Sequence, residues 1–341
     1  MSKSPEPAPA LVTGAAGFVG SHLVDALLAQ GTPVRALVRP STDRRWLDPA
    51  RVTFALGDVG DDRSEGRDAL ARAAAGCSVI YHAAGITNAA DSEDFERVNA
   101  GGAERVAAAA ARAGVPRVVL VSSQAAGGPT PGTLPRTEDD PDAPVGAYGQ
   151  SKIDGERRAA AALLGSATTL VSVRPPSVYG PRDTAFVLLF ALVQRGIVPL
   201  PAGSRQELSL VHATDLAEGI LLAGARGRPG GRYYLSGGPP VTTGGLVDAV
   251  GQALGKKPLR LDVPSGMLRA VVGLAEVWSR LTGAPARLTR ERLADWTSPR
   301  WTVSDARARA ELGYAPAVEL AAGIAQTAAW YRSVGWIARS T

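Results

Sequence analysis

From residue 10 to about residue 174, short apolar runs alternate with longer stretches of helical periodicity. The runs are apolar throughout rather than at every second residue, which is typical of parallel strands buried on both faces. Right-handed crossovers between such strands place helices on both faces of one sheet. We therefore predict an α/β fold with a doubly wound parallel sheet. The predicted strands are Ala10–Thr13, Val34–Val38, Val52–Leu56, Val79–His82, Val118–Val121 and Thr169–Arg174, with alanine-rich helices over 99–113 and 150–164.

The run LVTGAAGFVG at 11–20 follows the first predicted strand and opens a helix. Gly14 permits a sharp turn, Gly17 lets the backbone approach a pyrophosphate, and Gly20 lets the helix pack closely on the sheet. The helix N-terminus then offers free N–H groups to phosphates. The spacing is GxxGxxG rather than GxGxxG, and a glycine-rich turn without a ligand is the alternative. The strand before it and the helix after it favour a dinucleotide site.

The end of the second predicted strand selects the dinucleotide. An acidic side chain there would hold a ribose 2′-hydroxyl, whereas a basic one accommodates a 2′-phosphate. The sequence places Val38 and Arg39 at this end, with no acidic residue before Asp43. Arg39, assisted by Arg44 or Arg45, suits a phosphate through charge-assisted hydrogen bonds, unless these arginines are simply solvated. We predict that NADP(H) is favoured and that NAD(H) is possible.

The alternation changes after Arg174. We expect a proline-rich loop at 175–184, a helix through about 195, an irregular stretch at 196–205, and one strand and one helix over 207–225. Further strands are expected at Tyr233–Leu235 and Leu259–Leu261, with helices near 243–254, 265–282, 287–295, 304–311 and 318–333. The predicted layout is a disordered lead-in at 1–9, a dinucleotide-binding domain from 10–174 plus 206–228, and a smaller, mostly helical substrate-binding lobe from 175–205 plus 229–341.

Tyr148 and Lys152 lie four residues apart at the start of a predicted helix, so their side chains share one face. A phenol with a pKa of about 10 is a poor acid or base at neutral pH, and we expect the Lys152 ammonium and a nicotinamide cation to lower it. A tuned phenol suits proton transfer to an alcohol or carbonyl oxygen. Ser123 ends the fifth strand and can hydrogen-bond that oxygen, and Asn99 begins the preceding helix. Without Ser123 and Asn99, the YxxxK spacing would indicate only an exposed pair of side chains on a helix.

Several motifs in this order resemble one family. They are TGAAGFVG, GDV at 57–59, YHAAG at 81–85, VNAGG at 98–102, VSSQAA, YGQSK, RPPSVYGP at 174–181 and LVHATDLAEG at 210–219. Over about 10–335 the chain resembles extended short-chain dehydrogenases/reductases of the NAD(P)-dependent epimerase/dehydratase group, which have a Rossmann sheet. The resemblance implies that Ser123, Tyr148 and Lys152 are catalytic and that Asn99 supports Lys152 through a water.

The same resemblance implies a set of cofactor contacts, in which Asp58 meets the adenine and 175–178 flank the nicotinamide. The implied residues are Thr13, Gly14, Ala16, Gly17, Phe18, Val19, Gly20, Arg39, Arg45, Asp58, Val59, His82, Ala83, Ala84, Gly85, Val121, Tyr148, Lys152, Pro175, Pro176, Ser177 and Val178. His22, His82 and His212 are otherwise expected to support the backbone, and Asp215 is expected to cap a helix.

The segments on the expected substrate side are apolar, including FVLLFALV, GIVPLP and the predicted helix within 265–282. Nucleotide-sugar epimerases usually carry an asparagine where Ser177 stands and an arginine where Leu208 stands, although Arg182 or Arg205 could replace them. The chain also resembles the dihydroflavonol-reductase-like and 3β-hydroxysteroid-dehydrogenase-like branches. We predict an oxidoreductase that interconverts a ketone and a secondary alcohol on a hydrophobic molecule. The alternatives are a nucleotide-sugar epimerase or dehydratase with tightly bound NAD(P), and a non-catalytic dinucleotide-binding protein.

Composition and charge limit the partners. The 37 Lys and Arg residues against 32 Asp and Glu are scattered, so no nucleic-acid partner is expected. The apolar run at 185–193 is too short for stable membrane insertion, and the N-terminus lacks a secretory apolar region, so we expect a cytoplasmic protein. One cysteine and three distant histidines predict no metal site. Alanine-rich faces near 103–112 and 157–164 predict a homodimer.

Overall fold

The computed structural model describes residues 7–89, 91–200, 203–264, 266–267 and 298–338. Its main sheet has seven parallel strands in the order β11-β6-β5-β4-β1-β2-β3. The central strand β1 pairs with β2 on one side, Ala10 opposite Val34, and with β4 on the other, Ala10 opposite Val79. The strands are β1 (Ala10–Thr13), β2 (Val34–Val38), β3 (Val52–Leu56), β4 (Val79–His82), β5 (Arg117–Val121), β6 (Thr169–Arg174) and β11 (Arg232–Tyr234).

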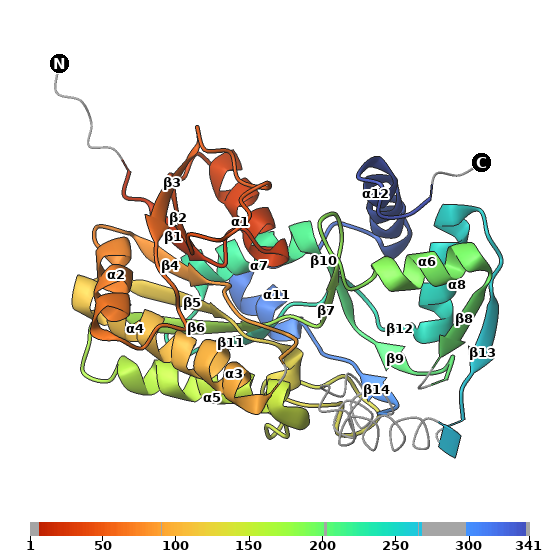
Figure 1. Cartoon of the computed structure of the whole chain (residues 1–341). Helices are drawn as coiled ribbons and strands as arrows, with labels where there is room; N and C mark the ends of the chain where they lie inside the picture. Colours follow the sequence, from red (N-terminus) through yellow and green to blue (C-terminus); the bar gives the residue numbers. More distant parts are fainter. Residues whose placement is uncertain (1–6, 90, 201–202, 265, 268–297, 339–341) are drawn as a thin grey trace, which may run out of the picture.

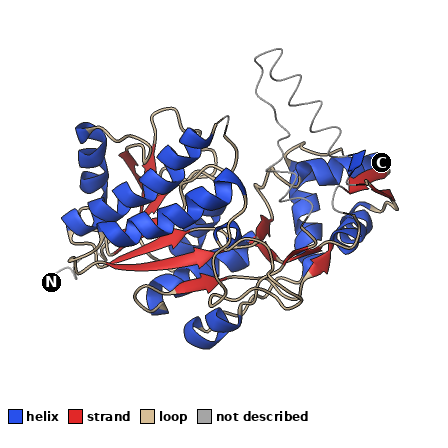
Figure 2. Ribbon diagram, turned by 90° about the horizontal axis from the view of Figure 1, so that it is seen from below, coloured by secondary structure: helices blue, strands red, loops and turns tan. Residues whose placement is uncertain are grey.

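Helices cover both faces of this sheet (Figure 1, Figure 2). One layer consists of α1 (Phe18–Ala29), α7 (Ala213–Arg226) and α11 (Ala306–Leu312), and the other of α2 (Ser64–Ala74), α4 (Gly101–Ala113) and α5 (Gly146–Ala162). Separate apolar clusters on the two faces bury these layers against the strands. The fold is therefore the predicted Rossmann-type α/β arrangement, with the order of strands reversing between β1 and β4.

The six strands expected before residue 175 are confirmed, and β5 begins one residue earlier than predicted. The main sheet also contains a strand that was expected in the smaller lobe. β11 pairs with β6, Tyr233 opposite Val173, and α11 packs beside it with Leu312 fully buried. The predicted domain boundary at 229 is therefore wrong for 232–234 and 306–312, which belong to the main domain and not to the smaller lobe. A three-residue strand does not reveal from its own pattern which sheet it joins.

The smaller lobe packs α6 (Val187–Arg195), α8 (Thr243–Leu254) and α12 (Leu320–Ser333) around one apolar cluster. Its short sheets pair β7 (Ser177–Tyr179) with β10 (Leu210–His212), β9 (Glu207–Leu208) with β12 (Val241–Thr242) and β14 (Arg300–Trp301), and β8 (Ile197–Leu200) with β13 (Leu259–Asp262). No helix among the described residues is both long and apolar enough to cross a bilayer.

Local predictions in this lobe were less accurate. The stretch 196–205 is not wholly irregular, because β8 buries Val198 and Leu200. The single strand expected at 207–211 is divided into β9 and β10 at the fully buried Ser209. The predicted helices near 265–282 and 287–295 lie outside the described residues, apart from 266–267, as do residues 1–6 of the expected lead-in. The described end of that lead-in is anchored, since the Ser78 amide donates to Pro9 O at 2.9 Å.

The alanine-rich surfaces of α4 and α5 pack partly against each other. Ala103 and Ala107 on α4 form a buried cluster with Ala159 and Leu163 at the end of α5. The helices approach closely because Gly155 has no side chain; a Cβ there would lie 3.0 Å from Asn99 O. Part of the surface that predicted a homodimer is therefore used within the chain, and the homodimer stays a prediction.

Candidate functional site

The glycine-rich turn after β1 forms a cradle of backbone. Gly14 has a φ of 69°, and a Cβ at this position would lie 2.6 Å from the Ala84 nitrogen. The Gly17 amide closes the turn by donating to Gly14 O at 2.9 Å, and a side chain at Gly20 would collide with the same carbonyl. Helix α1 starts without a side-chain cap or an acidic residue in its first turn. Its N-terminal N–H groups are therefore available for an anion, which fits the pyrophosphate of a dinucleotide.

A cavity of about 610 Å³ extends from this cradle along the carboxyl ends of the sheet strands. Nine of the implied cofactor residues line it, namely Gly14, Ala16, Gly17, Arg39, Asp58, Val59, Ala83, Ala84 and Gly85. Asp58 is fixed in place because its Oδ1 accepts the Gly60 amide at 2.8 Å. A cavity lined by the glycine-rich cradle and by polar side chains such as Asp58 fits the adenosine part of a dinucleotide.

The arginines around this cavity have different roles. Arg39 is exposed at the end of β2 and lines the cavity with Ser41 and Thr42. Arg45 is held by an ion pair with Asp43 and does not line it, whereas the Arg44 guanidinium lies 4.7 Å from the centre of the Phe54 ring. Of the three arginines proposed for a 2′-phosphate, Arg39 is the one that lines the cavity.

Arg97 is a lining residue that sequence reasoning missed. It belongs to the π-helical segment Glu96–Ala100 and donates to Asp94 Oδ1 at 2.7 Å. Its position two residues before Asn99 is the only sequence signal that could have pointed to it. The cavity thus has two arginines on its rim, one from β2 and one from the segment before α4.

Thr13 and His82 lie behind the cradle rather than on its surface. Both are buried, and Thr13 Oγ1 lies 2.6 Å from His82 Nδ1 while accepting the Ala84 amide at 3.3 Å. Burial lowers the pKa of His82 to about 3, so this ring is neutral. The pair therefore joins β1 to β4 and shapes the loop that contacts Gly14. Among the other implied contacts, Phe18, Val19 and Gly20 form the first turn of α1.

The three predicted catalytic residues meet at the carboxyl end of β5. Lys152 Nζ donates to Val121 O at 2.8 Å, which fixes the first turns of α5 to this strand. Ser123 Oγ accepts the Ala125 amide at 3.1 Å, and the Tyr148 phenol lies close enough to the Ser123 hydroxyl for that hydroxyl to lower the phenol pKa. The spacing of four residues thus brings phenol and amine to one helix face, as predicted. Such a group can hold an oxygen atom and move a proton to or from it.

The electrostatics of this group differ from the prediction. Burial raises the pKa of Tyr148, and the hydrogen bond with Ser123 opposes only part of that change. Burial also lowers the pKa of Lys152 to about 8, against an opposing effect of Glu156. The expectation that Lys152 lowers the phenol pKa is therefore wrong for the protein alone, because removal from water disfavours both charged forms.

Asn99 connects the loop after β4 to α5. Its Oδ1 accepts the Ile86 amide at 2.9 Å, and its Nδ2 donates to Ile86 O and to Ser151 Oγ, each at 3.0 Å. It lies in the π-helical segment, a distortion that is frequent at functional sites. A Cβ on Gly85 would lie 3.0 Å from Asn99 Oδ1 and 3.7 Å from Lys152 Nζ, so the two side chains approach the same loop. The implied water-mediated support of Lys152 stays a prediction.

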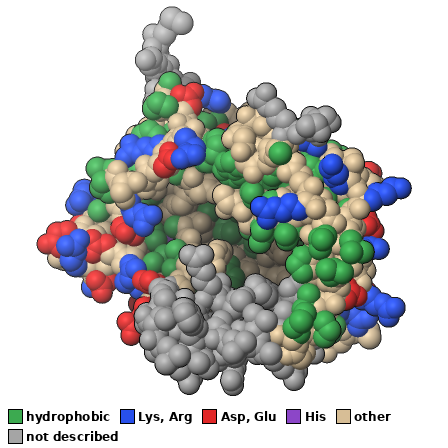
Figure 3. Space-filling view, turned by 45° about the vertical axis from the view of Figure 1, so that its right-hand side comes forward, with side chains coloured by type: hydrophobic (Ala, Val, Ile, Leu, Met, Phe, Trp, Pro, Cys, Tyr) green, Lys and Arg blue, Asp and Glu red, His purple; other side chains and the backbone are tan. Residues whose placement is uncertain are grey.

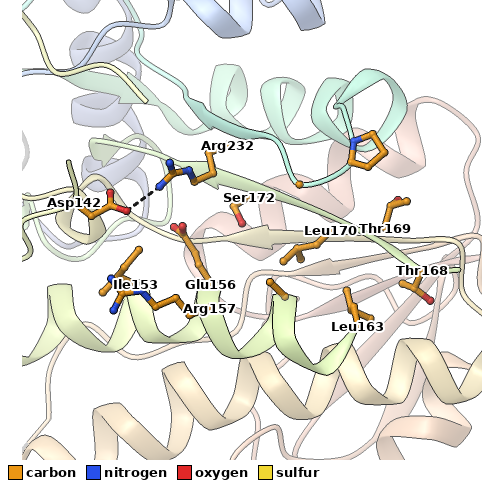
Figure 4. A pocket seen from close by; sticks show the side chains of 13 residues that line it. Asp142, Ile153, Glu156, Arg157, Leu163, Thr168, Thr169, Leu170, Ser172 and Arg232 are labelled. Carbon is orange, nitrogen blue, oxygen red and sulfur yellow. Dashed lines mark hydrogen bonds and ion pairs between the residues drawn. The ribbon is translucent and has the colours of Figure 1, made fainter. Parts of the chain in front are cut away.

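Behind the catalytic helix lies a buried network of charges. Arg174, at the end of β6, donates to both carboxylate oxygens of Glu156 at 2.8 and 2.7 Å and to Asp142 at 2.6 Å. Arg232 reaches Asp142 from β11 at 2.8 Å and borders a cavity of about 460 Å³ between α5, β6 and β11 (Figure 4). Glu156 follows Lys152 by one helical turn, so this network anchors the catalytic helix to the sheet.

The segment after β6 leads into the smaller lobe. Pro175 and Pro176 are buried, and Pro175 O accepts the Gln124 amide at 2.9 Å, so this segment lies beside the turn that follows Ser123. Ser177 and Val178 belong to β7, which pairs with β10. None of these four residues lines the 610 Å³ cavity, so their implied contact with a nicotinamide stays a prediction.

The prediction that Asp215 caps a helix is wrong. His212 Nδ1 accepts the Thr214 amide at the start of α7, whereas the Asp215 carboxylate accepts the amides of Ala317 and Val318 at 3.0 and 3.1 Å. Asp215 therefore fixes the chain that leads into α12 to the first turn of α7.

Comparisons with known proteins identify the family of this chain. The sequence matches the NAD dependent epimerase/dehydratase family over residues 10–236. It is 34% identical over 309 residues to the 4-hydroxy-2-methyl-3-oxo-4-farnesyl-3,4-dihydroquinoline-1-oxide ketoreductase of Stigmatella aurantiaca, covering 89% of this chain and 91% of that protein. It is 33% identical over 331 residues to the ceramide reductase of Caulobacter vibrioides, covering 96% of each.

A solved structure of a dTDP-glucose 4,6-dehydratase from Streptomyces venezuelae, with NAD bound, is similar as well. Its TM-score is 0.76 at 28% identity, covering 96% of this chain and 98% of that one. The relatives thus include reductases and a nucleotide-sugar enzyme on one fold. The chain therefore belongs to the NAD-dependent epimerase/dehydratase family and is an NAD(P)-dependent enzyme of the extended short-chain dehydrogenase/reductase type.

Proposed function

We propose that this enzyme interconverts a ketone and a secondary alcohol on a hydrophobic small molecule and favours NADP(H) over NAD(H). The observation that carries the proposal is the placement of Ser123, Tyr148 and Lys152 together at the carboxyl end of β5, where Lys152 Nζ donates to Val121 O at 2.8 Å. This strand end adjoins the cavity, since a Cβ on its lining residue Gly85 would lie 3.7 Å from Lys152 Nζ. This arrangement supplies a proton donor and a hydrogen-bonding group for one substrate oxygen.

The side chains would act as follows. Gly14 and Gly17 would hold the pyrophosphate of the cofactor, Asp58 the adenine, and Lys152 the nicotinamide ribose. When bound, the nicotinamide supplies the hydride to the carbonyl carbon. Ser123 would hold the carbonyl oxygen, and Tyr148 would donate the proton to it. Because burial raises the pKa of Tyr148, the phenol carries its proton at neutral pH and is prepared for reduction.

Arg39 supports a preference for NADP(H). Its guanidinium is exposed at the cavity, no ion pair joins it to another described residue, and its amide donates to Thr42 Oγ1 at 3.0 Å. The neighbouring Asp43, which would oppose a phosphate, is paired with Arg45. A free guanidinium near two hydroxyl groups suits a 2′-phosphate.

Two observations support a hydrophobic substrate. Arg182, which could have bound a substrate diphosphate, forms an ion pair with Asp25 of α1 at 2.8 Å, and its guanidinium lies 5.6 Å from the centre of the Trp46 ring. The ketoreductase is named for a molecule with a farnesyl group, and the ceramide reductase is named for ceramide. An apolar substrate needs no arginine at these positions.

A nucleotide-sugar epimerase or dehydratase is the second candidate. The similarity to the dTDP-glucose 4,6-dehydratase favours it, as does Arg205, which is exposed beside β9 and forms no ion pair with another described residue. Such an enzyme would retain its cofactor through a complete catalytic cycle and show no net oxidation of NADPH.

The deciding experiment follows NADPH and NADH oxidation with a panel of long-chain and polycyclic ketones, and follows product formation with nucleotide sugars. We expect NADPH oxidation with at least one hydrophobic ketone, and we expect Tyr148→Phe to slow it by about 10²–10⁴-fold. Conversion of a nucleotide sugar without net NADPH oxidation would replace the first candidate by the second.

A further inference from the structure

The paired strands β8 and β13 carry an apolar face toward solvent. On β8, Val198 and Leu200 are buried, whereas the alternate residues Ile197 and Pro199 are exposed. In the parallel register Leu259 lies opposite Ile197, and Leu261 lies opposite Pro199. Paired residues project to the same side of a sheet, so these four side chains form one surface. Ile197, Leu259 and Leu261 are 49, 59 and 45% exposed.

A two-stranded sheet with one buried face normally carries polar residues on the other. Here the solvent-facing side is apolar, although the opposite side of β13 carries Arg260, which pairs with Asp248 at 2.9 Å. Leu188 on α6 and Met267, five residues after β13, are also exposed in this lobe. Other exposed large apolar side chains, such as Leu56, Leu134 and Leu164, come from separate elements and need no explanation.

Three exposed cations lie at one end of the same strands. Because β8 and β13 run parallel, Arg195 before β8 and Lys256 and Lys257 before β13 come to the same end. The Leu259 amide donates to Gly196 O at 2.8 Å, which holds the start of β13 beside the residue that precedes β8. None of the three cations forms an ion pair with another described residue. Figure 3 shows hydrophobic side chains gathered beside Lys and Arg on the right-hand side, where this lobe comes forward.

We propose that this surface docks the protein on an anionic lipid surface. We call it the ribbon face and define it by the apolar residues Ile197, Pro199, Leu259 and Leu261 and the cations Arg195, Lys256 and Lys257. The apolar side chains enter the boundary between headgroups and acyl chains, and the cations lie against the phosphate groups. The unpaired cations favour lipid over a second copy of this chain, because an anionic surface neutralises all three together. The inference does not rest on the proposed reaction, since binding needs neither substrate nor cofactor.

The experiment measures co-sedimentation of the full chain with vesicles of phosphatidylcholine alone and of phosphatidylcholine with phosphatidylserine. Two double variants test the surface. The first, Leu259→Thr with Leu261→Thr, removes apolar area and keeps residues that favour strands. Lys256→Gln with Lys257→Gln removes charge. The matched controls are Leu164→Thr on the main domain, where Leu164 is 84% exposed, and Arg51→Gln with Arg72→Gln. Thermal unfolding and cofactor binding verify that each variant is folded.

We expect binding to the anionic vesicles, weaker binding to neutral ones, and a loss of about tenfold or more in each ribbon-face variant but not in the controls. Absence of binding to either vesicle, or equal losses in the controls, would overturn the proposal. A concentration-dependent dimer, seen by light scattering without lipid and dissociated by the Leu259→Thr, Leu261→Thr variant, would instead assign the face to a second copy. A variant that fails to fold is replaced by the single change Leu259→Thr, for which the same outcomes hold.

Discussion

Replacement of Lys152 by methionine should change how the stability of the protein depends on pH. In the folded protein, burial lowers the pKa of this amine to about 8, although Nζ donates to Val121 O at 2.8 Å. In the unfolded chain the amine regains its ordinary pKa of 10.5. Methionine has a similar length but cannot titrate, so a comparison of the two proteins isolates this one group.

The sign and size of the effect follow from proton binding. Between pH 8 and 10.5 the unfolded chain binds more protons at Lys152 than the folded protein, so the free energy of unfolding rises with pH in this window. Two and a half pH units, at about 1.4 kcal/mol each, give about 3.5 kcal/mol. Since Lys152 keeps partial contact with solvent, we expect about 2 kcal/mol. Buried tyrosines act in the opposite direction at high pH, but they are present in both proteins.

Urea unfolding, followed by tryptophan fluorescence, measures the free energy of unfolding of both proteins at intervals from neutral pH to about 10.5. We expect the unmodified protein to gain about 2 kcal/mol relative to Lys152→Met over this range. Lys256→Met is the control, because Lys256 is exposed, and its curve should parallel that of the unmodified protein. If the free energy of unfolding of Lys152→Met changes with pH in parallel with that of the unmodified protein, burial does not lower the pKa of the Lys152 amine.

Three substitutions test the site and its support, and one mass measurement tests the predicted homodimer. Tyr148→Phe should reduce turnover by about 10²–10⁴-fold in an NADPH oxidation assay while leaving cofactor affinity nearly unchanged, and near-normal turnover would remove the phenol from the mechanism. Arg39→Asp should weaken NADPH binding by about 1.5–3 kcal/mol and NADH binding much less, as titration of the intrinsic fluorescence would show; equal affinities in the unmodified protein would contradict the preference. Arg174→Met should lower the free energy of unfolding by about 3–5 kcal/mol, because it leaves the buried Glu156 carboxylate unpaired and Asp142 with Arg232 alone, and a loss below about 1 kcal/mol in urea unfolding would contradict this. Light scattering at micromolar concentration should give the mass of a homodimer, and a monomeric mass would contradict that prediction.

Strands were predictable where burial on both faces made the local pattern sufficient. Five of the six apolar runs before residue 175 form strands that are largely buried between two helical layers, whereas β3, at the edge of the sheet, is only partly buried. β11 could not be assigned to the main sheet from sequence, since its position depends on how Tyr233 packs between β6 and α11. The division of 207–212 into two strands could not be predicted from the sequence either, because it depends on residues that are distant in the chain. One of them is Val303, two residues after β14, whose amide donates to Ser209 Oγ at 3.0 Å.

The meeting of Ser123, Tyr148 and Lys152 was predictable, since helical spacing and the common edge of parallel strands determine it. The protonation of these groups was not, because the cost of burying a charge depends on the packing of α5 on β5. Spacing also gave no indication that Asp25 pairs with Arg182, or that Arg97 reaches the cavity. These contacts join segments that are distant in sequence.

The two altered pKa values also bear on the direction of the reaction. In the proposed reaction, reduction of a ketone would require a protonated phenol at Tyr148, and burial raises its pKa, so this form is present throughout the neutral range. The Lys152 ammonium is present below a pH of about 8 and is lost above it. The proton donor and the cation therefore occur together at and below neutral pH. Oxidation of an alcohol requires the phenolate, which burial disfavours, so that direction depends on a lower phenol pKa when the positively charged oxidised nicotinamide is bound. The side chains alone favour reduction.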